Sequence, residues 1–156
     1  MRLVKLLKFE RSKAAHQPIA NSIAQVLPYL LPDTIVTHLP TATSRQRERG
    51  YDQSQLIAKQ VAKQKKARYR PLLARLGQSR QVGATKGRRY EQAANMFRAL
   101  KPEAIQGAHI LLIDDILTTG ASLEAAAKIL KQAGAKQVDA AVFAQRGLGG
   151  PNPGKF

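Results

Sequence analysis

The stretch Ile110-Leu-Leu-Ile-Asp-Asp-Ile-Leu-Thr-Thr-Gly-Ala-Ser122 decides the fold of this chain of 156 residues. Four apolar residues lead into Asp114 and Asp115, which predicts a buried strand over 110–113 with an acidic end. A short turn of small and hydroxyl residues follows, and an alanine-rich helix is expected over 122–133. Such a turn presents free backbone N–H groups and the positive end of the helix dipole, which suit a phosphate group.

The residue types in this turn suit a sugar phosphate. Asp114 and Asp115 could accept hydrogen bonds from the vicinal hydroxyls of a ribose. Hydroxyl side chains would add donors and small residues would let the backbone approach closely; the residues concerned are Thr118, Thr119, Gly120, Ala121 and Ser122. We therefore predict a ribose 5-phosphate site, while a purely structural strand–helix junction with ordinary caps stays open as the alternative.

The run of apolar strand, two Asp residues, two spacers and Thr-Thr-Gly also resembles the phosphoribosyl-pyrophosphate (PRPP) signature of the type I phosphoribosyltransferases. This resemblance implies an α/β fold in which a central, mostly parallel sheet is flanked by helices and completed by a small hood region. It also implies that PRPP binds together with Mg²⁺. Asp114 and Asp115 would then be the catalytic carboxylates, with the metal held through the substrate near them rather than by direct protein bonds.

The rest of the chain fits one domain over 1–156 in which strands and helices alternate. We expect helix up to about residue 31 and strands over 34–39, 69–76, 96–100 and 137–144. Further helices are expected over 88–95 and, with Asp52 as its N-cap, up to about Lys66. The hood is expected from about 1–30 and 77–100, and 147–156 reads as a loose tail. Ligands of parallel sheets bind at the carboxyl ends of the strands, so the segments after residues 39 and 113 should share one pocket.

The segment after the first strand is basic and is expected to be a polar loop over 41–50. Three arginines fall within five residues there, and an arginine fork matches two phosphate oxygens at once. The small residues before them could close their backbone amides on a phosphate. We predict a pyrophosphate site made of Thr41, Ala42, Arg45 and Arg49; a solvated turn with an ion pair at Glu48 is the alternative.

A second resemblance covers nearly the whole chain. Residues 47–53, Arg-Glu-Arg-Gly-Tyr-Asp-Gln, resemble the Arg-Glu-Arg-Gly-Phe-Asn-Gln block of the ComF family, which is related to GntX-type proteins and associated with bacterial competence for DNA uptake. A further block, 79–97, is similar in its Gln, Arg, Asn and Phe positions: Gln81, Arg88 or Arg89, Asn95 and Phe97. The resemblance implies that Gln81 and Arg88 belong to a flexible hood loop that closes over the site.

The sequence departs from the family pattern at two places beside the predicted pyrophosphate site. The usual Val-Pro at the end of the first strand is His38-Leu-Pro40, and Asp52 stands where Asn is usual. The Cys-rich zinc module of many family members has no counterpart, since the chain contains no Cys. Whether His38 contacts the ligand stays open.

The chain carries 26 Lys and Arg against 10 Asp and Glu, a net charge of +16, and residues 45–101 hold 16 of the bases with three acids. Such a surface favours a polyanion, either a diphosphate substrate or nucleic acid, although a merely solvated surface is the plain alternative. The N-terminus lacks the apolar core of a signal peptide and no apolar run could span a membrane, so a cytoplasmic protein without membrane contact is expected.

Three functions therefore compete. The first is transfer of phosphoribosyl from PRPP to an unknown nitrogen acceptor. The second is a non-catalytic PRPP- or nucleotide-binding protein that assists DNA uptake, and the third is a DNA-binding protein with a vestigial pocket. The acceptor, the general base and the oligomeric state are not determined by the sequence, though a homodimer would be usual among the proteins it resembles.

Overall fold

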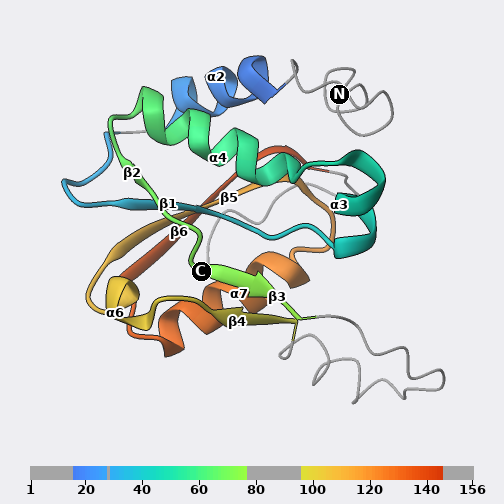
Figure 1. Cartoon of the computed structure of the whole chain (residues 1–156). Helices are drawn as coiled ribbons and strands as arrows, with labels where there is room; N and C mark the ends of the chain where they lie inside the picture. Colours follow the sequence, from blue (N-terminus) through green and yellow to red (C-terminus); the bar gives the residue numbers. More distant parts are fainter. Residues whose placement is uncertain (1–15, 28, 77–95, 146–156) are drawn as a thin grey trace.

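The computed structural model describes residues 16–27, 29–76 and 96–145. Its centre is a parallel four-stranded sheet in the order β2-β1-β5-β6 (Figure 1). The strands are β1 (Ile35–His38), β2 (Arg68–Tyr69), β5 (His109–Leu117) and β6 (Gln137–Gln145). An α/β fold with a mostly parallel sheet and flanking helices, as predicted, is confirmed.

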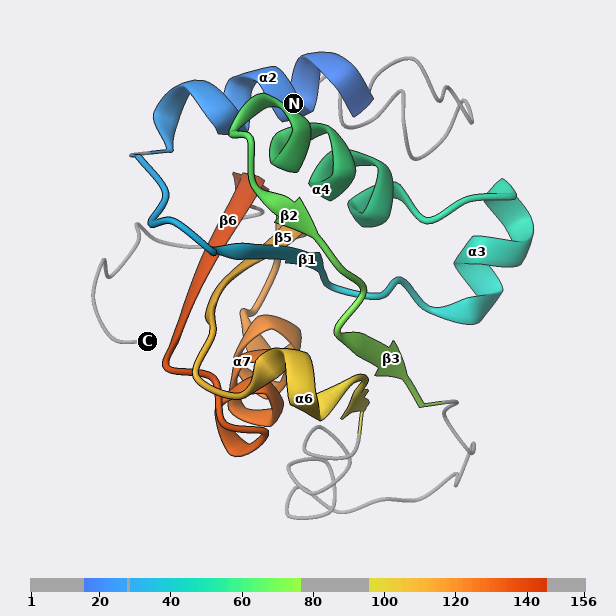
Figure 2. The ribbon, with the colours of Figure 1, turned by 60° about the vertical axis from the view of Figure 1, so that its left-hand side comes forward.

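Two helices cover one face of the sheet. The helices α2 (His16–Val26) and α4 (Gln53–Gln64) lie side by side there in both Figure 1 and Figure 2. Their apolar stripes pack on Val36, Leu111 and Ile113 of the central strands. Burying each such aliphatic side chain contributes about 1.5–3 kcal/mol, so this layer holds α4, and with it the start of α4, in place.

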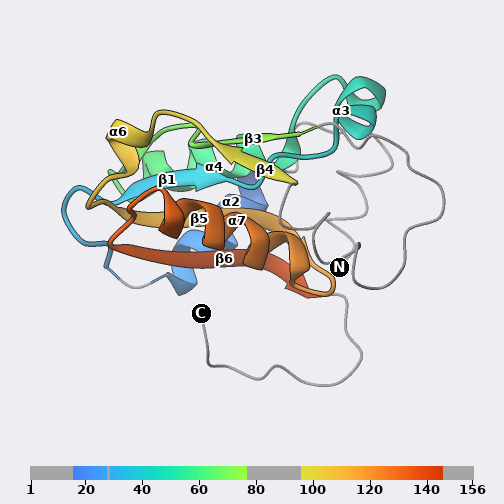
Figure 3. The same cartoon turned by 90° about the horizontal axis from the view of Figure 1, so that it is seen from below.

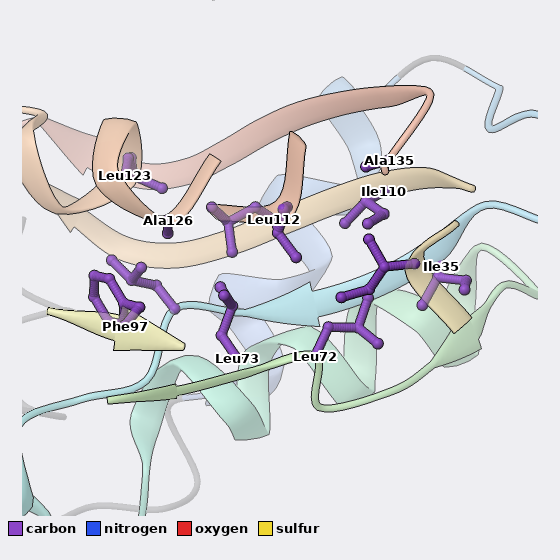
Figure 4. Packing of buried hydrophobic residues seen from close by; sticks show 12 residues of the cluster. Ile35, Leu72, Leu73, Phe97, Ile110, Leu112, Leu123, Ala126 and Ala135 are labelled. Atoms are coloured by element: carbon purple, nitrogen blue, oxygen red, sulfur yellow. The ribbon is translucent and has the colours of Figure 1, made fainter. Parts of the chain in front are cut away.

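The other face carries α7 (Ala121–Gln132), the one-turn helix α6 (Pro102–Ile105) and an antiparallel ribbon of β3 (Leu73–Arg75) and β4 (Phe97–Ala99), as seen from below in Figure 3. Side chains from the ribbon, α7 and the sheet interlock in a second core (Figure 4). Leu72, Leu112 and Leu130 in this core are fully buried. The central strands β1 and β5 are therefore buried on both faces, as is typical of a parallel sheet, whereas β6 at the edge is partly exposed.

Several predicted elements are confirmed and others need correction. The strand at 34–39, the strand at 96–100, the helix at 122–133 and the strand at 137–144 occur as β1, β4, α7 and β6 within one or two residues. The predicted helix at 88–95 lies outside the described residues. The helix α6 was not predicted; it is a single turn that begins at a proline.

The polar loop predicted over 41–50 is wrong, because residues 43–49 form a helix, α3 (Thr43–Arg49). This helix has no apolar periodicity, so its sequence gives no helical signal. It is closed at its end by Gly50, which adopts the left-handed conformation (φ 76°) and donates its N–H to the carbonyl of Gln46.

The single strand predicted over 69–76 is wrong as well. The chain pairs with β1 only at Arg68 and Tyr69, and β3 pairs instead with β4. Arg70 still donates its N–H to the Val36 carbonyl of β1 (3.0 Å), whereas the N–H of Leu72 bonds to the side chain of Thr37 (Oγ1, 3.1 Å) instead of a β1 carbonyl. The backbone hydrogen bonds to β1 thus end at Arg70, and the chain continues into the ribbon.

The central strand is longer than predicted. β5 continues to Leu117 because its pairing with β6 continues beyond the end of β1, through Asp114 opposite Val142 to Leu117 opposite Gln145. β1 ends at His38, opposite Ile113. Asp114 and Asp115 therefore lie on a strand of which only one side is still paired, and the space that β1 vacates becomes available for a ligand.

Candidate functional site

A cavity of about 440 Å³ lies at the carboxyl ends of β1 and β5. Its walls come from three parts of the chain that are distant in sequence. They are the segment after β1 together with α3, the end of β5 with the turn into α7, and β3; the lining residues are Leu39, Pro40, Thr41, Ala42, Arg49, Arg75, Asp114, Asp115, Ile116, Leu117, Thr118, Gly120, Ser122 and Leu123.

Most of the residues predicted to bind a phosphoribosyl group lie in this one cavity. Asp114, Asp115, Thr118, Gly120 and Ser122 line one side, and Thr41, Ala42 and Arg49 line another. Thr119 and Ala121 belong to the same turn, where the hydroxyl of Thr119 accepts a long bond from the N–H of Ala121 (3.4 Å). The side chain of Arg45 is not among those described, and Gln81 and Arg88 lie outside the described residues.

The turn at the start of α7 depends on the conformation of Gly120. Gly120 is the N-cap of α7 with φ of 81°, a left-handed conformation that glycine adopts without strain. A Cβ at Gly120 would meet only Leu117 Cδ1, at 3.7 Å, so the glycine is needed here for its conformation and not for space. The first N–H groups of α7 have no partners within the helix and face the turn.

The two carboxylates are held by α4, which is a contact that sequence reasoning missed. Ser54 Oγ donates to Asp114 Oδ1 (2.9 Å), and Gln53 Nε2 donates to Asp115 Oδ2 through a short bond. Gln53 and Ser54 are each 1% exposed. Gln53 is the last residue of the block at 47–53 and Ser54 follows it, so the match of Gln53 to the family block is the signal that could have pointed to this contact.

Burial strongly perturbs one of the two carboxylates. The loss of solvent around Asp114, reinforced by the negative charge of Asp115, raises the pKa of Asp114 to about 7. The hydrogen bonds from the Asp115 N–H and from Ser54 oppose this shift without cancelling it. A carboxyl with a raised pKa in a polar cavity is typical of a functional site.

The cationic side of the cavity includes a residue that was not predicted. Arg75 of β3 lines the cavity, donates to the Pro40 carbonyl (3.4 Å) and lies 5.3 Å from the centre of the Phe97 ring. Arg49, which was predicted, bonds to the Gln53 carbonyl oxygen Oε1 (3.4 Å). Two guanidinium groups and two carboxylates thus line the same cavity, and the Gln53 amide bonds to both Arg49 and Asp115.

The segment after β1 is held in place by hydrogen bonds to Asp52. Thr41 donates both its N–H (2.9 Å) and its hydroxyl (3.1 Å) to the buried carboxylate of Asp52. These two groups are therefore engaged within the protein, although Thr41 itself lines the cavity. Asp52 is also the N-cap of α4, as predicted, and accepts the backbone N–H of Gln55 (3.2 Å).

The residues that the structure describes contain no group of three or more His, Cys, Asp and Glu that could hold a metal ion. Within those same ranges, no helix is long and apolar enough to cross a membrane. Asp114 and Asp115 supply carboxylate oxygens beside the cavity, and these suit a Mg²⁺ ion that is held mainly through the phosphates of a substrate.

Comparison with solved structures places the fold. Glutamine phosphoribosylpyrophosphate amidotransferase from B. subtilis, complexed with ADP and GMP, superimposes with a TM-score of 0.60 at 16% identity, covering 83% of this chain and 26% of that chain. A structure described as the allosteric regulatory enzyme of purine biosynthesis gives the same TM-score at 17% identity, with the same coverage. These similarities show a type I phosphoribosyltransferase fold.

Sequence comparison gives the family. The competence protein ComFC of Bacillus subtilis (strain 168) is 31% identical over 100 residues, which are 64% of this chain and 39% of that protein. The chain thus matches well under half the length of this curated relative, and the resemblance to ComF-type proteins is confirmed. The model of the phosphoribosyl transferase domain family matches residues 17–154. From its fold, its motif and this match, the chain belongs to the phosphoribosyl transferase domain family.

Proposed function

We propose that this protein binds PRPP in the cavity and transfers its phosphoribosyl group to a nitrogen acceptor. One observation carries the proposal: two carboxylates, the turn before α7 and two arginines, which come from separate parts of the sequence, line the same cavity. The 5-phosphate would bind the turn Thr118–Ser122 and the ribose hydroxyls would bind Asp114 and Asp115. The diphosphate would lie beside Thr41 and Ala42, with Arg45 and Arg49 as the predicted cations.

Mg²⁺ is proposed to enter with the substrate, near Asp114 and Asp115. When bound, the ion would neutralise charge on the diphosphate and make it a better leaving group. The two carboxylates supply oxygen donors, and Ser54 and Gln53 hold them from behind so that their outer oxygens can face the cavity.

The transfer would break the bond between C1 of the ribose and the diphosphate oxygen, and form a bond between C1 and the acceptor nitrogen, which loses a proton. Positive charge develops on the sugar in between, as it does in glycoside hydrolysis. Ionised Asp114 and Asp115 would stabilise that charge, while Arg49 and Arg75 would stabilise the negative diphosphate as it leaves.

The proposal includes a dependence on pH. Because the pKa of Asp114 is raised to about 7, this residue is only partly ionised at neutral pH in the free protein. A bound cation would favour the ionised form. Ligand binding with Mg²⁺ should therefore release a proton near pH 7, which titration in buffers of different ionisation enthalpy would detect.

Calorimetric titration of PRPP, with and without Mg²⁺, tests the binding step. Wild type should bind only with Mg²⁺, and the double variant Asp114→Asn/Asp115→Asn should not bind. Asp139→Asn is the matched control, because Asp139 is an exposed carboxylate on β6 that bonds to Gln137. Absence of wild-type binding would refute the proposal. Release of pyrophosphate in the presence of candidate nitrogen bases would then identify the acceptor.

The second candidate is a non-catalytic role, in which a PRPP- or nucleotide-binding protein also contacts DNA during competence. The observation in its favour is a stretch over 53–70 with six basic and no acidic residues, of which Lys59, Lys63, Lys66 and Arg68 are exposed. Nucleic-acid binding through this surface should weaken steeply with salt. A labelled oligonucleotide titrated at rising salt, with the variant Lys63→Glu/Arg68→Glu, distinguishes this role, since PRPP binding should not change in that variant. A homodimer and a cytoplasmic location stay predictions.

A further inference from the structure

The two places where the sequence departs from the ComF pattern meet in the structure. His38, at the end of β1, and Asp52, the N-cap of α4, have their side chains 6% and 1% exposed, with Nε2 and Oδ2 separated by 3.9 Å. Neither residue lines the cavity. The segment Leu39 to Ala42, which follows His38 and is bonded to Asp52 through Thr41, lines it at every position. A buried carboxylate at this position requires partners, because an unpaired charge in the interior is costly.

Asp52 finds those partners in three separate parts of the chain. It accepts the N–H and hydroxyl of Thr41 (2.9 and 3.1 Å), the side-chain amide of Gln46 in α3 (3.1 Å) and the N–H of Gln55 in α4 (3.2 Å). Hydrogen bonds to a charged acceptor are about twice as strong as neutral ones. One side chain thus fixes the segment after β1, the helix α3 and the start of α4 relative to one another.

We propose that Asp52 is a positioning residue for the diphosphate side of the cavity, acting through Thr41 and Gln46. The inference rests on the proposed function for the identity of the ligand. Asp52 holds the backbone at Thr41 and Ala42, and it fixes the start of the helix whose last turn carries Arg49. The 5-phosphate turn Thr118–Ser122 is formed by the end of β5 and the start of α7, and Asp52 makes no bond to it in the described structure.

His38 closes the remaining side of the Asp52 carboxylate. Its Nδ1 lies 2.9 Å from the hydroxyl of Tyr69 in β2, so that with Tyr69 donating, the proton of the imidazole is on Nε2 and faces Asp52. Lys59 of α4 is the other charged group that acts on the imidazole, and it disfavours a second proton. A neutral His38 leaves the bonds from Thr41 and Gln46 to Asp52 without competition from an imidazolium.

The two sides of the cavity can be tested separately with two ligands. PRPP uses both sides, whereas ribose 5-phosphate lacks the diphosphate. In calorimetric titrations with Mg²⁺, Asp52→Ala should lower PRPP affinity by about tenfold or more, because well-formed hydrogen bonds at one wall are lost. Ribose 5-phosphate affinity should fall by about threefold or less, because only the indirect effect on Gln53 and Ser54, through the lost cap of α4, remains. Asp52→Asn, which retains one acceptor oxygen and is the residue usual in the family block, should restore most of the PRPP affinity.

Val61→Ala is the matched control. Val61 is fully buried in the same helix, α4, and is not in the cavity, so this variant loses stability without losing the Asp52 contacts. Equal losses for PRPP and ribose 5-phosphate in Asp52→Ala, or the same pattern in Val61→Ala, would overturn the inference. If Asp52→Ala does not fold, the comparison of the two ligands is made with Asp52→Asn against wild type, where a smaller but still selective loss is expected.

Amide hydrogen exchange separates this inference from the proposed function. In the ligand-free protein, Asp52→Asn and Asp52→Ala should speed exchange across residues 41–46 and leave residues 119–124 unchanged. This result is expected even if wild type binds no PRPP, an outcome that would refute the proposed function alone. Unchanged exchange at 41–46 would refute the positioning role whatever the ligand.

Discussion

The hydroxyl of Ser54 donates to Asp114 Oδ1 at 2.9 Å, and so joins the first turn of α4 to the carboxyl end of β5 across 60 residues of chain. Asp114 also accepts the N–H of Asp115 (2.8 Å) at the same oxygen. Even with these two donors, burial and the adjacent negative charge keep the pKa of Asp114 raised to about 7. Above about pH 7, ionised Asp114 therefore lowers the stability of the unliganded protein.

The first prediction concerns Asp114→Asn. The folded protein keeps Asp114 protonated up to about pH 7, whereas the unfolded chain ionises it near its ordinary value of 3.8. The free energy of unfolding of wild type therefore falls, through this group, as the pH rises from about 4 to about 7. The Asn amide oxygen can still accept both hydrogen bonds and carries no charge, so the variant should be more stable than wild type by about 1–3 kcal/mol at pH 8.

Urea unfolding of both proteins at pH 4.5 and pH 8 checks this prediction. The advantage of the variant should be present at pH 8 and shrink toward zero at pH 4.5, while its PRPP affinity is lost. A stability difference that does not depend on pH would mean that the ionisation of Asp114 is not perturbed by folding.

The second prediction concerns the contact between Gln53 and Asp115. Gln53→Ala removes the amide that donates to the buried Asp115 carboxylate and also removes a partner of Arg49. We expect a loss of about 1–3 kcal/mol in the free energy of unfolding at pH 7, because the carboxylate is left without that donor. PRPP binding should weaken as well, since Asp115 and Arg49 both line the cavity.

Gln64→Ala serves as the control for Gln53→Ala. Gln64 lies in the same helix and bonds to Asn21, but it is exposed and distant in sequence from the site. Its substitution should change stability by less than about 0.5 kcal/mol and leave binding unchanged. Similar losses in the two variants would show that the burial of Gln53 does not matter.

The third prediction concerns Gly120→Ala in the turn before α7. The added methyl group meets only Leu117 at an ordinary contact distance, so the cost is that of a left-handed backbone in a residue with a side chain, about 1–2 kcal/mol. Gly107 has nearly the same φ (71° against 81°), its Cβ would have no neighbour within 4 Å, and it does not line the cavity.

The comparison of Gly120→Ala with Gly107→Ala therefore separates the effect on ligand binding from the effect on stability. Thermal unfolding should show similar losses of stability in the two variants. Affinity for ribose 5-phosphate should fall only in Gly120→Ala, because its turn faces the phosphate. Equal affinities in both variants would exclude that turn as the phosphate site.

The fourth prediction concerns His38. Burial lowers the pKa of His38 below its ordinary value of 6.5, while Asp52 partly offsets and Lys59 adds to the shift. The unfolded chain therefore takes up a proton at this position first, and the free energy of unfolding should decrease as the pH falls below about 6.5. His38→Gln is uncharged at every pH and should lose less stability between pH 7 and pH 5 than wild type does, as measured by urea unfolding at the two values.

Much of this fold is encoded in short patterns of apolar and capping residues. An apolar run followed by carboxylates identified β5, buried apolar positions identified α4, an alanine-rich segment identified α7, and Asp52 was correctly expected as a helix cap. These features succeed because burial of one face and the capping of a helix end are decided by residues only a few positions apart. The short helix α3 was not predicted, because its sequence is polar throughout and one of its contacts, from Gln46 to Asp52, forms only in the folded chain.

The sequence by itself determined which functional groups are present: a carboxylate pair and a turn suited to phosphate on one segment, and arginines on another. Only the tertiary structure decided which of these groups share a cavity and which residues support them. Arg75 enters the cavity because the chain leaves the sheet after Arg70 and pairs with β4 instead, and Gln53 and Ser54 reach the carboxylates because α4 packs across β5. The physical reason is that hydrogen bonds and desolvation act through space, so the charge of Asp114 and the anchoring of Thr41 are set by neighbours that lie far away along the chain.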